Sequence, residues 1–433
     1  MLSRLRHALW GDLTKEEFKK FGMLSLTFLF IIGTYWLMRP LKDALFMKIV
    51  GKLYIPYAKI ASLFVLVPLI MLYSKLVDMV EKHKLFYVIC SIYGILFASI
   101  AYCLADPVMG LSNNVPNKNR ILGWVIYLAI ESFGSLVVAL FWSFVASATD
   151  TSAAKRGYPL IIAGAQIGSI TGPTLATQAT RIGLPQLAVI IAVGILIVPF
   201  LIKSFVGSYP AAAAEGHKET KKPTGMTEGL RLLLAKPYLL GILGIATLYE
   251  VIGTILDYQM KFIADETYAS AEQVAEFLGL FGQSANFLAL VFALVGTSFF
   301  IRRFGLTFCL VMFPLAVSVV VLYVWFNPSL WVLFGAMVVI KGLSYALNNP
   351  CKEIMYIPTS KDVKFKSKSW IDAFGGRSAK ATGSGINAMF TQMVDLMFYG
   401  SLISLGIVGF WIFIALYVGR TNAQLVKEGK IID

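Results

Sequence analysis

Long apolar runs recur along the whole chain and constrain its fold more than any other feature. A helix needs about 20 predominantly apolar residues to cross the hydrocarbon core of a bilayer. Twelve stretches meet this requirement, and they lie near residues 21–41, 55–78, 85–105, 121–147, 158–180, 183–205, 237–260, 277–301, 304–326, 329–349, 381–400 and 401–419. The sequence therefore predicts an all-α polytopic membrane protein with about 12 transmembrane helices.

The overall composition supports this fold class and excludes others. Hydrophobic residues make up 58% of the 433 residues and charged residues 14%, and the mean hydropathy is +0.73. A typical soluble domain has about 45–50% apolar and about 25% charged residues. A water-soluble enzyme, a disordered protein and a coiled coil are therefore all excluded as fold classes.

Residue patterns that catalyse reactions or bind metal ions are sparse in this chain. The four cysteines are scattered, and the sequence lacks the Cys-x-x-Cys and Cys/His clusters typical of a zinc site or a disulfide framework. The three histidines, His7, His83 and His217, fall in predicted cytoplasmic loops. We therefore predict that the protein is not an enzyme, with no catalytic residues, no metal site and no cofactor.

Basic residues outnumber acidic residues, with 38 Lys and Arg against 24 Asp and Glu, which gives a formal charge of +14. In a membrane protein such an excess either sets the orientation through cytoplasmic loops or lines a path for anions. If the N-terminus is cytoplasmic, about 27 of the basic residues fall in cytoplasmic segments, and about nine lie on the opposite side or at span ends. This distribution predicts that both termini face the cytoplasm and that the number of spans is even.

The longest internal polar stretch divides the predicted spans six and six. Large transporters are often built from two such halves around a central site. The predicted organisation is a cytoplasmic N-terminus at 1–20, a six-helix bundle at 21–205, a cytoplasmic linker at 206–236, a second six-helix bundle at 237–419 and a cytoplasmic tail at 420–433.

A group of charges closes the first apolar run, where Arg39, Lys42 and Asp43 surround Pro40. One interpretation is an interfacial anchor whose long side chains reach toward the headgroups. The other is that Pro40 breaks the helix and the cations face a pore. Three more lysines follow on the same, outer side, namely Lys48, Lys52 and Lys59. Because a topological anchor would lie on the inner side, this local excess favours the second interpretation.

Acidic residues also fall inside the predicted spans, where a charge costs roughly 2.5–3.5 kcal/mol to insert and usually faces a cavity or a partner. Glu131 lies in the fourth span and Glu250 in the seventh, whereas Asp257 lies nearer the outer end and is interpreted as interfacial; Asp395 belongs to the same set of acids. Each glutamate either pairs with a lysine, for which Lys341 in the tenth span is a candidate, or titrates as a proton site. A purely structural ion pair between helices is the alternative.

A strongly basic segment, 350–380, is predicted to be a cytoplasmic loop below the tenth span. It contains Lys352 and is followed by Gly383-Ser384-Gly385, which is predicted to begin a helix. Glycine-rich backbone at the start of a helix can present amide groups to an anion. The nucleotide-binding pattern Gly-x-x-x-x-Gly-Lys-Ser/Thr is not present, so a P-loop nucleotidase is excluded.

Three charged segments together resemble the ATP/ADP translocase family of obligate intracellular bacteria and plastids. The first is Leu37-Met-Arg39-Pro-Leu-Lys42-Asp43. The second is Ala154-Lys155-Arg156-Gly157-Tyr158-Pro159-Leu160, with Gly164-Ala165. The third is Asn349-Pro350-Cys351-Lys352-Glu353-Ile-Met-Tyr356-Ile-Pro358, with Lys366-Ser-Lys368-Ser-Trp-Ile371-Asp372. The resemblance extends from about residue 15 to about residue 420.

The resemblance implies a twelve-span transporter with an architecture of the major facilitator type. Members of the family exchange ATP for ADP, import nucleotides with protons or carry NAD. Lys42, Glu131 and Glu250 match positions that the family uses in transport. The expected phosphate-binding residues are Arg39, Lys42, Lys341 and Lys352, and the expected charge-pair or coupling residues are Asp43, Glu131 and Glu250. Secondary candidates for the site are Tyr249, Asp372, Arg377 and Lys380.

Three positions depart from the family pattern: Val311 replaces a lysine, Asn349 an aspartate and Gly157 an aromatic residue. Because substrate charge and countercharge set the coupling, these departures leave proton-coupled import of a nucleotide or NAD open beside ATP/ADP exchange. An exchanger of organic phosphates or other anions, a flippase for a lipid-linked precursor and a membrane scaffold are the rival classes. The expected partners are a nucleotide and membrane lipid but no nucleic acid, and the expected state is a monomer in a bacterial inner membrane.

Overall fold

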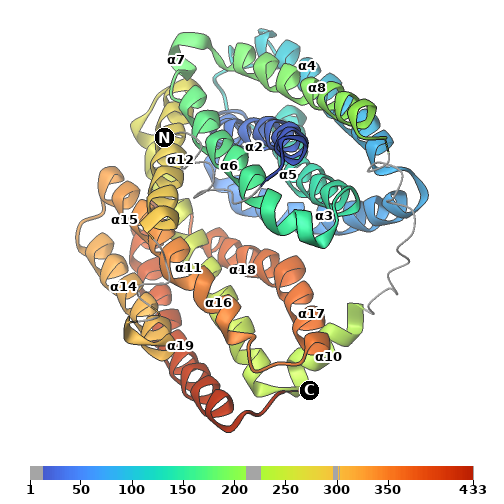
Figure 1. Ribbon diagram of the computed structural model, residues 1–433. Coiled ribbons are helices and arrows are strands. Elements are labelled where there is room, and N and C mark those ends of the chain that lie inside the picture. Colours follow the sequence, from blue (N-terminus) through green and yellow to red (C-terminus); the bar gives the residue numbers. More distant parts are fainter. Residues whose placement is uncertain (1–12, 211–225, 296–300, 302, 433) are drawn as a thin grey trace. The chain divides into compact units, whose positions relative to one another are not determined.

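The computed structural model describes residues 13–210, 226–295, 301 and 303–432 and is almost entirely helical (Figure 1). The first 12 residues of the predicted N-terminus and residues 211–225 of the predicted linker lie outside the described part. The remainder of the linker contains a helix, α10 (Met226–Ala235). Helices therefore account for nearly all of the described chain, as the apolar runs predict.

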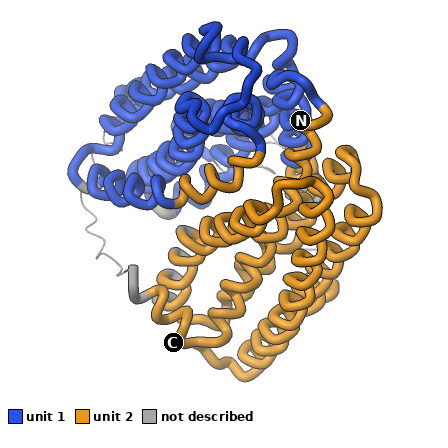
Figure 2. The backbone as a smooth tube through the Cα atoms, turned by 180° about the vertical axis from the view of Figure 1, so that it is seen from behind, with its two compact units in different colours: residues 1–52, 64–220, 268–286 blue, residues 53–63, 221–267, 287–433 orange. Residues whose placement is uncertain are grey.

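The chain divides into two compact units, coloured separately in Figure 2. Unit 1 contains Met1–Lys52, Phe64–Thr220 and Tyr268–Asn286. Its complete long helices are α2 (Lys15–Ile49), α4 (Lys82–Ala105), α5 (Ile121–Ser147), α6 (Thr151–Ala176) and α8 (Leu184–Ser208), and α7 (Ala179–Ile182) is a single turn. Within this unit α2 packs against α5, α6 and α8, and α4 packs against α5 and α8.

Unit 2 contains Leu53–Leu63, Lys221–Thr267 and Phe287–Asp433. Its helices include α11 (Pro237–Thr267), α14 (Leu306–Phe326), α15 (Leu330–Leu343), α16 (Asn349–Met355), α17 (Lys361–Trp370), α18 (Gly376–Ala388) and α19 (Met393–Glu428). In this unit α11 packs against α15, α18 and α19, and α14 packs against α19. The π-helical turns η3 (Ser344–Asn348) and η4 (Ile371–Gly375) join α15 to α16 and α17 to α18.

Two helices contribute residues to both units, so the units differ in detail from the two predicted bundles. The first turns of α3 (Ile55–Met79) belong to unit 2, and the first part of α12 (Ala271–Val295) belongs to unit 1. The division into bundles at 21–205 and 237–419 therefore stays a prediction.

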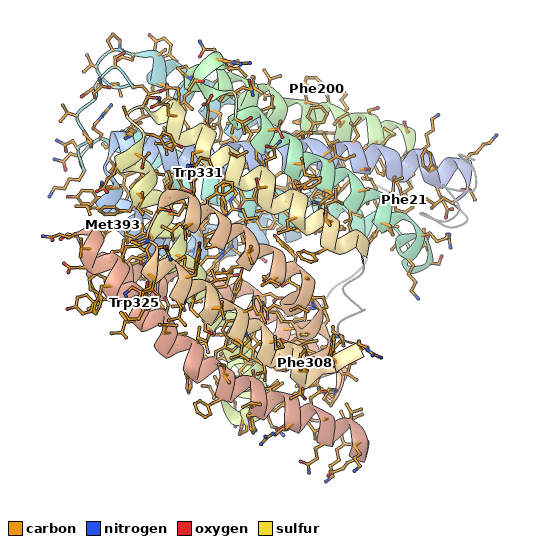
Figure 3. The ribbon with its side chains drawn as sticks, turned by 90° about the vertical axis from the view of Figure 1, so that its left-hand side faces the viewer. Phe21, Phe200, Phe308, Trp325, Trp331 and Met393 are labelled. Atoms are coloured by element: carbon orange, nitrogen blue, oxygen red, sulfur yellow. The ribbon has the colours of Figure 1, made fainter. Side chains whose placement is uncertain are left out.

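Among the described residues, ten helices are long and apolar enough to cross a membrane. Many of their large apolar side chains are exposed, such as Phe200 on α8 and Phe308 on α14, whose exposed fractions are 73% and 46% (Figure 3). Soluble proteins do not expose apolar surface on this scale. The protein is therefore a multi-pass membrane protein whose exposed apolar side chains face lipid.

One of the two remaining predicted spans corresponds to α6, which is rich in small and polar residues. The other, predicted at 381–400, divides between the end of the continuous helical run 361–388 and the start of α19. The boundaries predicted for the last two spans are wrong. The chain does not break at residue 400, because α19 is one helix of 36 residues that begins at Met393. The basic segment after α16 is not a loop, because residues 361–375 form the start of the eleventh helical run, and the predicted tail continues α19 to Glu428.

The prediction that Pro40 breaks the first helix is also wrong. Helix α2 begins with a capping box, in which Thr14 Oγ1 accepts from the Glu17 N–H and the Glu17 carboxylate accepts from the Thr14 N–H, and it continues through Pro40 to Ile49. A proline removes one backbone hydrogen bond, but in lipid the remaining backbone groups still need partners within the helix. The charges that follow Pro40 therefore lie on a continuous helix.

Gly383-Ser384-Gly385 does not begin a helix, which corrects the prediction of an amide-lined anion site at these glycines. Gly383 lies inside α18, and a Cβ atom placed on it would be 2.8 Å from the Val251 carbonyl oxygen. The amide groups inside a helix are already used in its own hydrogen bonds. The glycine therefore allows close packing of α18 on α11.

Candidate functional site

The first cluster of charges lies in unit 1, where Lys42 of α2 contacts Glu131 of α5. The Lys42 residue is 5% exposed, and its Nζ atom lies 3.7 Å from Asp43 Oδ1 and 4.4 Å from the ring centroid of Tyr127. A buried ammonium group needs this combination of counter-ions and ring face to offset its lost hydration. Three of the predicted site residues are thus brought together.

Arg39 lies one turn before Lys42 on α2 and interacts with aromatic rings of the same helix. Its guanidinium carbon is 4.7 Å from the centroid of the Trp36 ring and 6.0 Å from that of Tyr35. A guanidinium group carries a planar fork of N–H donors that matches the geometry of a phosphate group. Arg39 therefore fits a role in binding an anion.

The second cluster lines a cavity of about 450 Å³ in unit 2, between α11, α16 and the helical run 361–388. Small-molecule sites typically range from about 300 to 1,000 Å³. The charged residues of the lining are three lysines and three acids, and they are Lys352, Lys368, Lys380, Glu250, Glu353 and Asp372. The lining therefore combines cations for an anion with carboxylates that balance them.

Two ion pairs cross this cavity lining. Lys380 Nζ lies 3.7 Å from the carboxylate of Glu250, and Lys368 donates to the carboxylate of Glu353. Asp372 is open to solvent, yet partial desolvation by the cavity walls raises its pKa, against the opposing effect of Lys368 and Lys352. The cavity thus holds a carboxyl group that binds a proton more readily than an ordinary aspartate does.

A third group of charges surrounds Asp257 in unit 2, which the sequence indicated to be interfacial. Its Oδ2 atom lies 2.6 Å from Lys261 Nζ and 3.1 Å from Lys59 Nζ. Lys341, considered above as a partner for either glutamate, interacts electrostatically with Asp257. The structure therefore places Lys341 with Asp257 and outside the residues that line the cavity.

Other sequence candidates occupy different surroundings. Tyr249 is 9% exposed and packs between Phe313 and Trp411, at centroid distances of 5.4 and 6.5 Å, so its ring is part of the core of unit 2. Arg377 lies on α18 next to a lining residue, Gly376, but does not itself line the cavity. Asp395 lies in the exposed first turn of α19, where the positive end of the helix dipole favours an acid.

The structure shows what surrounds two of the positions that depart from the family pattern, Asn349 and Gly157. Asn349 lines the cavity of unit 2, so the amide replaces what would be a fourth carboxylate. A Cβ atom on Gly157 would lie 2.3 Å from the ring of Phe21, which is fully buried. The Phe21 ring therefore occupies the space beside Gly157 and leaves no room for an aromatic residue there.

Three charged residues that take part in these clusters were not among the site residues expected from the sequence: Glu353, Lys368 and Lys261. Lys261 follows Asp257 by four residues, which is the spacing of an ion pair on one helix face and a signal that was available. Glu353 and Lys368 lie on different helices, and nothing in their spacing indicates that they meet.

Comparison with known proteins identifies the family of this chain. The model of the TLC ATP/ADP transporter family matches residues 1–421. The chain belongs to this family. The expectation drawn from its three charged segments is therefore confirmed, and the family consists of transporters.

Relatives in the family cover nearly the whole chain at low identity. ADP,ATP carrier protein 1 of Rickettsia prowazekii (strain Madrid E) is 24% identical over 500 aligned positions, which cover 99% of this chain and 98% of the relative. The chloroplastic ADP,ATP carrier protein 2 of Arabidopsis thaliana is 24% identical over 473 positions, which cover 95% of this chain and 76% of the relative. Both carriers are named for ADP and ATP.

Solved structures show the same fold. A bacterial homologue of the iron transporter ferroportin, in an inward-facing state, matches with a TM-score of 0.65 and 14% identity over 94% of this chain and 100% of its own. The peptide transporter POT matches with a TM-score of 0.62 and 13% identity over 93% of this chain and 95% of its own. The fold of this family member is thus of the major facilitator type, as its sequence resemblance implied.

Proposed function

We propose that this protein exchanges ATP for ADP across a bacterial inner membrane by alternating access. One observation carries the proposal: in each unit, a transmembrane glutamate that matches a transport position of the family is paired with a lysine. Glu131 contacts Lys42 in unit 1, and Glu250 lies 3.7 Å from Lys380 in unit 2. Both relatives described above are ADP,ATP carriers, which supports the choice of substrate.

The pairs suggest how exchange becomes obligatory. The phosphates of a nucleotide compete with each glutamate for its lysine, since phosphate groups bind Lys and Arg through charge-assisted hydrogen bonds. Arg39 adds a forked donor in unit 1, and Lys352 adds a cation in unit 2. Without substrate, the lysines return to the glutamates, and reorientation of the empty carrier is disfavoured. An incoming nucleotide then allows the next reorientation.

Reconstitution into proteoliposomes tests this function directly. Vesicles preloaded with ADP are expected to take up labelled ATP, and vesicles without counter-substrate are expected to take up far less. NAD and a hexose phosphate serve as competitors in the same assay. Uptake that is independent of internal nucleotide, or that is inhibited by hexose phosphate but not by ADP, would contradict ATP/ADP exchange.

Proton-coupled import is the second candidate, and it is favoured by Asp372 in the cavity of unit 2. A carboxyl group with a raised pKa can bind a proton on one side of a membrane and release it on the other. If this mode operates, an uncoupler abolishes net accumulation in vesicles that contain no nucleotide. Exchange between equal internal and external nucleotide pools is insensitive to the uncoupler, so the two modes are separable.

A further inference from the structure

We infer that the cavity of unit 2 contains a phosphate subsite in which Lys368 is a binding residue and Glu353 is its displaceable counter-ion. The inference deepens the proposed function and rests on it for the identity of the ligand. Neither residue stands among the site residues that the family resemblance implies. Lys380 with Glu250 forms a second pair in the same lining, so the subsite has two such pairs.

The charge balance of the lining is the first argument. Three lysines and three acids give a formal charge of zero when every group is ionised. A lining without carboxylates would hold three ammonium groups in a confined space and raise the cost of the empty state through mutual repulsion. The carboxylates therefore stabilise the lysines until an anion with several charges replaces them.

The exposure of the pairs is the second argument, because a counter-ion that leaves must be weakly held. The side chains of Lys368 and Glu353 are 32% and 56% exposed, and that of Lys380 is 56% exposed. Ion pairs in contact with water contribute little to stability, since hydration competes with them. In contrast, the Lys42 side chain in unit 1 is 7% exposed. The pairs of unit 2 thus have the exposure that a displaceable contact requires.

The placement of the two residues is the third argument. Glu353 lies on α16 and Lys368 on α17, and the chain between these helices turns at residues 356–360. Lys352, the neighbour of Glu353, also lines the cavity. A phosphate group that displaces the Glu353 carboxylate therefore meets the ammonium groups of Lys368 and Lys352. Each ammonium group is a compact charge at the end of a flexible side chain, so it can adjust to the phosphate.

Replacing either member of the pair with the uncharged residue glutamine is expected to change the affinity for ADP, in opposite directions for the two residues. Lys368→Gln removes a cation and is expected to raise the Kd for ADP about tenfold, because a hydrogen bond to a charged group is lost. Glu353→Gln removes the competitor and is expected to lower the Kd severalfold. Lys364→Gln is the matched control, because Lys364 lies one turn earlier on the same helix and does not line the cavity.

The measurements are equilibrium titrations of the purified full-length protein with ADP, with tripolyphosphate and with adenosine. The opposite shifts are expected for ADP and tripolyphosphate but not for adenosine, which has no phosphate. If Lys368→Gln and Glu353→Gln both weaken binding and both lower the unfolding temperature, the pair is structural and the inference is overturned. It is also overturned if Lys368→Gln behaves like Lys364→Gln.

The results separate this inference from the proposed function. If the wild-type protein binds tripolyphosphate with the opposite shifts but does not exchange ATP for ADP, the subsite stands and the exchange proposal fails. If the wild-type protein exchanges nucleotides and neither variant differs from the control, the exchange proposal stands and the subsite fails.

Discussion

The strength of a lysine's ion pair in this protein depends on how exposed the pair is to water, as Lys42 and Lys380 illustrate. The side chain of Lys42 is 7% exposed and has Glu131, Asp43 and an aromatic ring around it, whereas the side chain of Lys380 is 56% exposed and lies 3.7 Å from one carboxylate. Breaking a buried ion pair costs on the order of 3–5 kcal/mol, whereas an exposed pair contributes about 0–1 kcal/mol. The same residue type therefore gives a pair in unit 1 that is costly to break unless another anion replaces Glu131, and a more weakly held pair in unit 2.

The first prediction concerns the pair of Lys42 and Glu131. Lys42→Gln is expected to abolish uptake of labelled ATP in ADP-loaded proteoliposomes, because phosphate loses its cation in unit 1. It is also expected to destabilise the protein by on the order of 3 kcal/mol, because Glu131 loses its partner. Thermal unfolding in detergent measures this loss.

The double substitution Lys42→Gln with Glu131→Gln separates the two effects. It removes both charges, so stability is expected to recover while transport remains absent. Lys118→Gln, in an exposed loop, is the control for the loss of one lysine. Recovery of transport in the double variant would mean that the pair has only a structural role.

The second prediction concerns pH and Asp372. Because partial desolvation raises the pKa of this carboxyl group, protonation begins at a higher pH than for an ordinary aspartate. Protonation removes one negative charge from the cavity, so affinity for ADP is expected to increase as the pH falls toward that pKa. Asp372→Asn is expected to flatten this dependence, as measured by titration with ADP between pH 5 and about pH 8.

The matched control for this prediction is Asp395→Asn, which changes an exposed acid at the start of α19. In this variant Asp372 is unchanged, and the phosphates of ADP titrate as they do with the wild-type protein. The affinity for ADP should therefore depend on pH as in the wild type. An unchanged pH dependence in Asp372→Asn would assign the effect to another group.

At the scale of helices, close packing in unit 2 depends on particular glycines of α18. A Cβ atom on Gly383 would meet the backbone of α11 at Val251 and the side chain of Thr254, at 2.8 and 2.9 Å. A Cβ atom on Gly385, two residues later, would meet no atom within 4 Å. The two glycines of one short motif therefore have different structural roles.

The third prediction follows from this difference. Gly383→Ala is expected to destabilise the protein by roughly 1–3 kcal/mol, because the backbone of α11 cannot yield as a flexible side chain would. Gly385→Ala is expected to be neutral or to stabilise by up to about 1 kcal/mol, because alanine favours the helix. Thermal unfolding of both variants measures the difference, and equal effects would contradict the close contact.

Helix α2 shows how far local signals predict an element. Its apolar run near 21–41 predicted a helix, and Thr14 and Glu17, which form the capping box at its start, have the residue types of a local capping signal. Its end does not, because the proline and the charges after it would terminate a helix in water. In lipid the cost of unpaired backbone groups outweighs the local preference of Pro40.

For the whole molecule, the basic residues give the most direct prediction about orientation. About 27 of the 38 Lys and Arg residues fall in segments that lie on one side of a twelve-span arrangement with a cytoplasmic N-terminus. Part of that charge, in residues 352–380, has a second role, because it lines the cavity of unit 2. We therefore infer that both termini face the cytoplasm.

The fourth prediction tests this orientation in intact cells. One cysteine is introduced at a time, at Lys84 in the first turn of α4 or at Lys118 in the segment after α4, in a background in which Cys103 is replaced by serine and the three buried cysteines remain. A membrane-impermeant maleimide is expected to label position 118 directly and position 84 only after the membrane is permeabilised. The reverse pattern would mean that both termini face outward.

The limits of prediction from this sequence are visible in particular residues. Lys42 and Glu131 were both identified, because charges inside apolar runs stand out against their surroundings. Lys341 was expected beside a glutamate, and the structure shows that it also interacts electrostatically with Asp257, which the sequence did not indicate. Glu353 and Lys368 were not singled out, because each lies in a run of charges that topology alone would explain.

The sequence by itself determined that the protein crosses the membrane many times as helices, and it indicated the family and the few charges inside the spans. These follow from local properties, because the length of an apolar run and the cost of a charge in lipid do not depend on the rest of the fold. The tertiary structure alone decided which charges meet, where Lys368 reaches Glu353 and which glycine allows two helices to touch. Such contacts join residues far apart in the chain, so packing and not local pattern determines them.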